Sequence, residues 1–222
     1  MFGGVATLFS ARQKGGYYDF TDLSTLAANS DGSGSAVAIG GDARWCRDLS
    51  PNGNHLRNII SSVVVQPHGV ATSGTNYGLF NMPGFGNWPM IAEPITMVAC
   101  FEILSFGATD DRLIGSSGSG QILQGTRAGS IRLFSNYSPE VVPGLNREVV
   151  VTGVWNGPKS SIALNRDTPI TWTSSGGAMN ALCIGSATGP GPCAAVRFKR
   201  LFVREGLLST TDRDGVLSWA GA

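Results

Sequence analysis

Charged side chains are scarce in this sequence. Asp, Glu, Lys and Arg make up 14% of its 222 residues, whereas an average globular domain contains roughly 25%. Helical proteins need more Glu, Lys and Leu than this, so the shortage argues against a helical fold. The formal net charge is only +1, which provides no overall field to attract nucleic acid or an anionic membrane. We therefore expect neither of these as a partner.

Signatures of a metal site are also missing. The four cysteines, Cys46, Cys100, Cys183 and Cys193, form no CxxC pair, and the sequence has only 2 histidines, so zinc is not expected. Cys100 lies inside an apolar run, which favours a buried free thiol. Cys183 and Cys193 flank a loop rich in Gly and Pro, so a disulfide across a hairpin is one alternative and free thiols are the other.

Long apolar runs are absent as well. No stretch reaches the ~20 apolar residues that a membrane-spanning helix needs. The apolar start at residues 1–9 is short, and its positive charges, Arg12 and Lys14, follow rather than precede it, which is not the order of a signal peptide. We expect a protein that is made in a cytosol and has no membrane partner.

Strand signals dominate what is present. Residues 95–104 alternate at a period of two with apolar side chains on both faces, which is typical of a central strand covered on both sides. The 31 glycines, about twice the usual share, favour many turns. This pattern predicts an all-β antiparallel sandwich. Further strands are expected at residues 59–65, 112–115, 121–124, 130–134, 148–155, 161–164, 169–173, 182–185 and 195–203.

The chain divides into an arm and one domain. We predict an extended N-terminal arm at residues 1–16 and a single domain at residues 17–222. Within the domain, residues 17–90 are expected to form an irregular wrap, and residues 91–222 the regular sandwich.

A short helix is expected at the C-terminus. Ser209 and Asp212 have the spacing of a capping box, which predicts a helix start. Val216, Leu217 and Trp219 would then face inward.

The loop at residues 48–55, called the Asx-rich loop below, is dense in turn-forming residues. Asp and Asn side chains bond nearby backbone N–H groups, Pro presets φ, and Gly allows positive φ. A fixed loop is therefore expected. Trp45 before it and Leu56 after it are expected to anchor it in the core.

Several of these segments resemble a known family. Residues 95–101, the hairpin at residues 151–165, residues 182–185 and the last strand from Phe198 to Leu208 resemble the concanavalin A-like, laminin-G-like jelly roll. The part of the chain from residue 20 to residue 81, called the lead-in below, resembles a narrower group of proteins. Its residues 20–26, the loop from Trp45 to His55 and residues 79–81 resemble jelly-roll proteins that are frequent in tailed phages and prophages.

The resemblance implies a two-sheet jelly-roll sandwich and a role in a virus particle. The leading expectation is a non-enzymatic structural protein of a tailed phage virion, either a capsid decoration or cement protein or a component of a head or tail fibre. Its partners would be the major capsid protein or other virion proteins, and it would be located in the virion after assembly in the host cytoplasm. A homo-oligomer is expected, with a trimer by analogy with capsid accessory proteins.

Two alternatives from other classes remain open. A lectin-like module for host attachment would bind surface glycans through aromatic side chains on loops; the candidates are Tyr77, Phe85, Trp88 and Tyr137, with Trp88 the best placed. Such aromatics can instead cap the core. A glycoside hydrolase would need two carboxylates flanking the scissile bond. The Glu-x-Asp-x-x-Glu run of hydrolases with this fold is absent.

The resemblance also raises Ca²⁺ as a cofactor, since laminin-G-like rims often bind it. The candidate ligands are Asp48, Asn52 and Asn54, with Asp110 and Asp111 as a second group. Their spacing is not that of an EF-hand loop. Hydrogen bonding within the turn is the stronger interpretation of the first group, and no other cofactor is expected.

Overall fold

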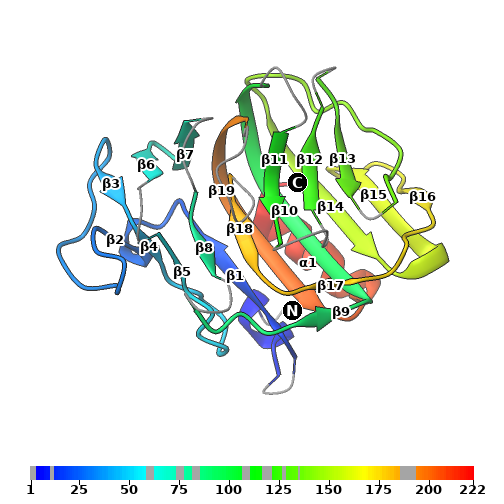
Figure 1. Cartoon of the computed structure of the whole chain (residues 1–222), viewed down its shortest axis with the longest axis horizontal. Helices are drawn as coiled ribbons and strands as arrows, with labels where there is room; N and C mark the ends of the chain where they lie inside the picture. The colour runs from blue at the N-terminus through cyan, green and yellow to red at the C-terminus, as the bar shows by residue number, and fades with distance from the viewer. Residues whose placement is uncertain are drawn as a thin grey trace.

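The computed structural model of the chain is an antiparallel sandwich of two large sheets, which confirms the predicted all-β fold class (Figure 1). The structure describes residues 4–10, 13–58, 63–73, 78–81, 86–106, 111–116, 122–126, 129–134, 136–185 and 194–222.

The larger sheet has the strand order β16-β15-β14-β10-β19-β7-β6-β3, with β1 also paired to β19. The bounds of its strands are β1 (Gly15–Asp19), β3 (Asp42–Ala43), β6 (Val63–Gln66), β7 (Gly69–Ser73), β10 (Ile95–Ser105), β14 (Glu148–Trp155), β15 (Ser160–Leu164), β16 (Ile170–Trp172) and β19 (Ala195–Glu205).

The second sheet has the order β13-β12-β11-β18-β8-β5-β4-β2, and β9 and β17 form a separate pair. The bounds are β2 (Leu26–Ala27), β4 (Trp45–Cys46), β5 (Leu56–Arg57), β8 (Phe80–Asn81), β9 (Ile91–Ala92), β11 (Asp111–Gly115), β12 (Ile122–Gly125), β13 (Ile131–Phe134), β17 (Ala178–Met179) and β18 (Leu182–Ile184).

Strand β10 is central, as its alternation predicted. It pairs with β14 on one side and with β19 on the other. Its inward side chains, among them Met97 and Phe101, are fully buried between the sheets. Its outward side chains Val98 and Cys100 are buried too, in a second apolar cluster on the opposite face. A strand that is apolar on both faces requires a cover on both, and here the outer cover is not a sheet.

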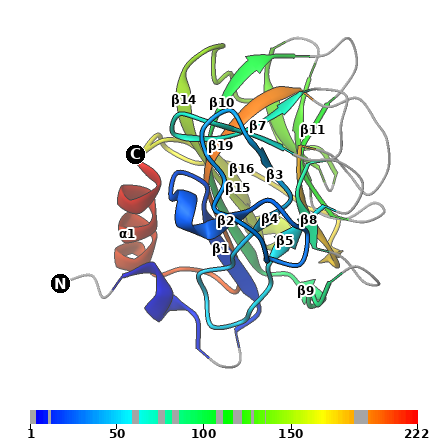
Figure 2. The same ribbon diagram turned by 90° about the vertical axis from the view of Figure 1, so that its left-hand side faces the viewer.

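That outer cover consists of the C-terminal helix and the N-terminal arm. Helix α1 (Thr210–Ala220) begins at Ser209, whose side chain accepts a hydrogen bond from Asp212 N–H, as the capping pattern predicted. The arm makes a 3₁₀ turn at Val5–Leu8 and lies beside α1 on the same face of the larger sheet (Figure 2). The ring of Phe9 lies 5.3 Å from that of Phe202, so arm, helix and sheet share one apolar cluster.

The expected inward residues of the helix are confirmed in part. Val216 and Leu217 are buried, whereas Trp219 is partly buried and packs edge-on against Tyr17. Among the helices in the described ranges, none is long and apolar enough to cross a membrane.

The N-terminal third contributes to both sheets. Short strands from residues 26 to 81 extend them, and β1 pairs with β19 from Gly15 onward. Gly15 has φ 133°, and a Cβ there would lie 2.1 Å from the carbonyl oxygen of Val203, so the close approach of β1 to β19 needs glycine. Leu56 is fully buried as expected, but Trp45 is only partly buried and packs on His55.

The described cysteines are free and buried. Burial raises the pKa of Cys183 to about 12, and burial together with the neighbouring Glu148 carboxylate raises that of Cys100 to about 12. These thiols are therefore unreactive at neutral pH. Cys193, the candidate disulfide partner of Cys183, lies outside the described residues.

The outer cluster should contribute strongly to stability. Replacing Phe202 by Ala removes a fully buried ring that contacts both the sheet and the arm. We expect Phe202→Ala to lower the free energy of unfolding by about 3–5 kcal/mol. Leu207→Ala, at an exposed position, is the control and should change it by less than about 0.5 kcal/mol. Urea denaturation followed by fluorescence measures both, and similar values for the two variants would contradict the role of this cluster.

Candidate functional site

The Asx-rich loop is held by the carboxylate of Asp48. This buried group accepts hydrogen bonds from the backbone N–H groups of Tyr17 at 3.1 Å, Ser50 at 2.9 Å and Asn54 at 2.8 Å, and from the Ser50 hydroxyl at 2.7 Å. Burial raises the pKa of Asp48, and the bonds from Ser50, Asn54 and Tyr17 oppose that rise. The predicted turn bonding within the loop is therefore observed.

The loop also fastens the first strand to the sandwich. The Asn52 side-chain amide donates to the carbonyl oxygens of Gln13 at 2.9 Å and Gly15 at 3.0 Å, and the Asn54 amide donates to Gly15 at 2.7 Å. These long-range bonds could not be read from the loop's composition. They show that the loop positions the chain where the arm enters β1.

The candidate calcium ligands Asp48, Asn52 and Asn54 do lie together, but each makes protein hydrogen bonds. In the described part of the chain, no three His, Cys, Asp or Glu side chains gather in a group that could hold a metal ion. Asp110, of the second group, lies outside the described residues, and nothing is described of the Asp111 side chain. Calcium binding stays a prediction.

Of the four candidate sugar-stacking aromatics, Trp88 and Tyr137 lie in the described residues. Trp88 is only 4% exposed and belongs to the core between the sheets, so it caps the core and does not offer its ring to a sugar. Tyr137 is 55% exposed, but the Arg132 guanidinium lies over its ring at 4.2 Å. Tyr77 and Phe85 lie outside the described residues.

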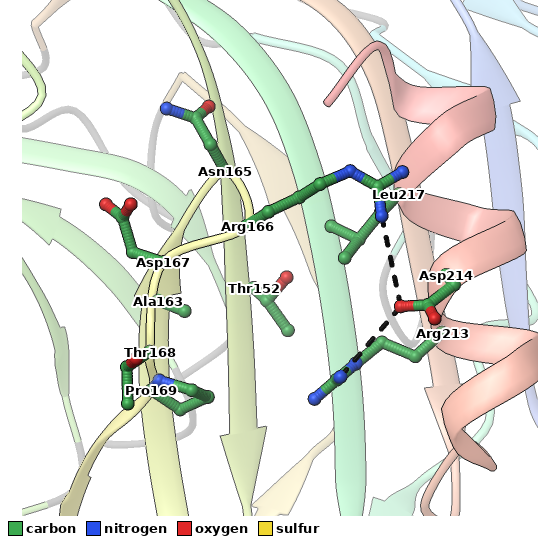
Figure 3. A pocket seen from close by; sticks show the side chains of 10 residues that line it. All are labelled: Thr152, Ala163, Asn165, Arg166, Asp167, Thr168, Pro169, Arg213, Asp214 and Leu217. Atoms are coloured by element: carbon green, nitrogen blue, oxygen red, sulfur yellow. Dashed lines mark ion pairs between the residues drawn. The ribbon is translucent and has the colours of Figure 1, made fainter.

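A pocket of about 330 Å³ opens on the outer face of the larger sheet, between β14, β15 and α1 (Figure 3). One wall is the turn after β15. Asn165 there adopts a left-handed conformation with φ 48°, which Asn tolerates, and its side chain accepts a hydrogen bond from Val150 N–H. The turn is closed by a bond from Asp167 N–H to the Leu164 carbonyl at 2.8 Å. Asn165 therefore takes the left-handed position of this turn, a position that glycine often occupies.

Two guanidinium groups reach into the pocket from opposite walls (Figure 3). Arg166 comes from the turn and donates to Ser218 Oγ at 2.9 Å and to the Ala222 carbonyl at 3.1 Å, which ties the turn to the end of the helix. Arg213 comes from α1. Both guanidiniums lie near one carboxylate oxygen of Asp214, at 4.0 Å and 3.9 Å.

The floor of the pocket is Thr152 on β14. Thr152 is only 7% exposed. Its hydroxyl is buried and has no hydrogen-bond partner in the described structure. Leu217 of α1 and Ala163 of β15 add apolar surface. The pocket therefore combines positive charge, a free hydroxyl and a small apolar area, which are the elements of a binding site for a small polar ligand.

Several carboxylates elsewhere on the larger sheet are ion-paired. Glu102 lies 2.6 Å from Arg197 and Asp19 lies 3.1 Å from Arg200. Glu148 pairs with Lys199, and the hydrogen bond from Lys199 lowers the pKa of Glu148. A general acid must hold its proton near neutral pH, and neighbouring cations oppose this.

Comparison with known proteins identifies the fold. No family model matches the chain, and no curated protein matches it. Solved structures do. A Trypanosoma rangeli sialidase in complex with 2,3-difluoro-KDN has a TM-score of 0.61 at 13% identity, covering 89% of this chain and 36% of the sialidase. An arabinofuranosidase complexed with arabinofuranosyl-alpha-1,2-xylobiose has a TM-score of 0.61 at 13% identity, covering 92% of this chain and 61% of the enzyme.

These likenesses establish a shared β-sandwich fold of the jelly-roll type. This chain spans about a third of the sialidase and about three fifths of the arabinofuranosidase. At such identities the comparison carries the fold alone.

The pocket was not identified from the sequence. Its residues come from β14, the turn after β15 and α1, and nothing in the sequence says that the helix packs against that turn. The one available signal was Thr152, a polar residue in the apolar run of residues 149–154.

The Asp48 carboxylate should be hard to replace. Asparagine has one acceptor oxygen instead of two, and its NH₂ group would face N–H donors. We expect Asp48→Asn to lower the free energy of unfolding by about 2–3 kcal/mol. Asp31, which accepts from the Ser33 N–H and hydroxyl at the surface, is the matched control, and Asp31→Asn should leave the free energy of unfolding almost unchanged. Equal costs in chemical denaturation would contradict the anchoring role.

His55 should make stability depend on pH. Its Nδ1 accepts a hydrogen bond from Asp48 N–H at 3.0 Å, so it must be unprotonated there, and burial lowers the pKa of His55 from 6.5. The unfolded chain then binds the proton more tightly, so the free energy of unfolding should fall as pH drops below 6.5.

The test compares urea denaturation at neutral and mildly acidic pH. His55→Phe keeps a ring against Trp45 and should lose this component of the pH dependence. His68→Asn is the control, because His68 has φ 65°, a conformation that Asn accepts. The assignment fails if the pH dependence follows His68 instead.

Proposed function

We propose that the protein is a non-catalytic structural component of a tailed phage or phage-like particle, where it decorates or cements the capsid or forms part of a head or tail fibre. The lead-in from residue 20 to residue 81 resembles proteins of such particles. The ion-paired carboxylates described above support a role without acid–base chemistry.

The observation that carries this proposal is the surface at one end of the sandwich. Strand β16 ends the larger sheet, and in the described residues no strand pairs with its outer side (Figure 1). Beside it, Asn136 donates to the Thr173 carbonyl at 3.3 Å, which joins the segment after β13 to the end of β16. An open strand edge can pair with another chain.

Exposed apolar side chains accompany this edge. Ile170 of β16 is 44% exposed, and Tyr137, which follows Asn136, is 55% exposed. We call these two residues, Tyr137 and Ile170, the edge surface. Apolar residues beside an open edge favour contact with another protein. A second copy of the chain and the neighbouring virion proteins are the proposed partners.

A lectin-like module for host attachment is the second candidate. Two observations favour it: the fold is shared with structures of glycosidases bound to sugars or their analogues, and the pocket beside α1 suits a small polar ligand. Mass spectrometry of purified particles separates the two roles. Hundreds of copies per particle support decoration, whereas a few copies together with glycan binding support attachment.

The edge surface predicts self-association that a charge disrupts. We expect the protein to form an oligomer, with a trimer as the proposed state, and Ile170→Glu to shift it towards monomer by about tenfold or more in dissociation constant, since it buries an unpaired charge. Ile39→Glu, at an exposed apolar residue far along the chain, should leave the oligomer intact. Size-exclusion chromatography with light scattering measures both. A wild-type monomer that is also absent from particles would overturn the proposed function.

A further inference from the structure

We propose that the pocket between β14, β15 and α1 binds a small ligand through a carboxylate group. The ligand is either a free organic acid or an acidic sugar residue, which present the same group to the protein. The pocket shares no residue with the edge surface, so this inference does not depend on the proposed virion role.

The floor residue is the first argument. Thr152 pairs across the sheet with Val98 on one side and Ala163 on the other, so its hydroxyl has no polar side chain beside it in the register. The adjacent outward positions, Val98 and Val150, are apolar and buried. A buried hydroxyl without a partner is unfavourable, and valine would fill the same volume without that cost. A ligand oxygen would satisfy the hydroxyl.

The charges are the second argument. Arg166 and Arg213 face the cavity with Asp214 as the carboxylate between them, and both contacts are at the long end of the range for ion pairs. Asp167 also lines the pocket, but in Figure 3 its carboxylate points away from both guanidiniums, and no ion pair of Asp167 occurs in the described residues. The groups that face inward therefore carry one excess positive charge.

The unpaired hydrogen-bond donors of the pocket narrow the chemical class of the ligand further. The Nε of Arg213 and the hydroxyl of Thr152 are both buried, and neither has a hydrogen-bond partner in the described structure. A guanidinium binds the two oxygens of a carboxylate side by side, which makes this group a better match than a spherical anion. One carboxylate also balances the single excess charge, which a phosphate dianion would exceed.

Size limits the rest of the ligand. The volume of about 330 Å³ is near the lower end of small-molecule sites, and Leu217, Ala163 and Pro169 supply an apolar lining. The pocket therefore suits a carbon body of one sugar ring or less.

The test is a titration of the full chain, followed by NMR or calorimetry, with acetate, glucuronate, glucose and inorganic phosphate. We expect a carboxylate to bind with a dissociation constant of about 1 mM or tighter, and glucose at least about tenfold more weakly than glucuronate. Glucuronate binding more tightly than acetate identifies an acidic sugar, and equal binding identifies the carboxylate of a simple acid. Glucose or phosphate binding as tightly as the carboxylates, or no saturable binding of either carboxylate, would overturn the proposal.

Variants locate the site. Thr152→Val removes the hydroxyl and keeps the shape, so it should weaken carboxylate binding by about fivefold while leaving the thermal midpoint unchanged or higher. Arg213→Gln should weaken binding by about tenfold. The controls are Thr171→Val on the exposed edge strand and Arg112→Gln on the other sheet, which should bind as wild type does. Wild-type affinity in both pocket variants would place the ligand elsewhere and overturn the assignment.

Both pocket variants should leave the oligomeric state unchanged, since neither residue belongs to the edge surface. In the unaltered protein, an oligomer without carboxylate binding would mean that this inference fails, whereas carboxylate binding without an oligomer would mean that the proposed assembly role fails. The two failures are therefore distinguishable.

Discussion

The need to cover both faces of β10 governs this structure. Its inward side chains meet the second sheet, as in any sandwich, but its outward side chains Val98 and Cys100 are equally apolar. Since burying apolar surface is the main driving force of folding, the outer face must also find a cover. Helix α1 and the N-terminal arm provide it, so the two ends of the chain are integral parts of the fold.

This arrangement creates the candidate site as a consequence. A helix laid on a twisted sheet cannot touch every strand equally, and a pocket remains between α1, β14 and β15. Arg166 crosses the gap to Ser218 and the chain end, and so fixes its width. The same packing that stabilises the sandwich thus brings two arginines over a buried threonine.

The Asx-rich loop has a supporting role in this scheme. By bonding Asp48 to Tyr17 N–H and the Asn54 amide to Gly15, it fixes the strand that leads from the arm into the sheet. The loop and the outer cluster therefore hold the two ends of the segment that runs from the arm into β1. Of the loops in the lead-in, this one is a structural anchor, while the surfaces that we propose for binding lie at β16 and beside α1.

The sequence alone determined the fold class, the central place of β10, the capped C-terminal helix and the turn bonding of Asp48, because each rests on local periodicity or on hydrogen bonds between near neighbours. Only the tertiary structure decided that Trp88 is core, that Asn52 and Asn54 reach the first strand, and that Thr152, Arg166 and Arg213 share a pocket. Those facts depend on which faces of the strands, loops and helix meet. Residues far apart in the chain carry no local sequence pattern that records such contacts.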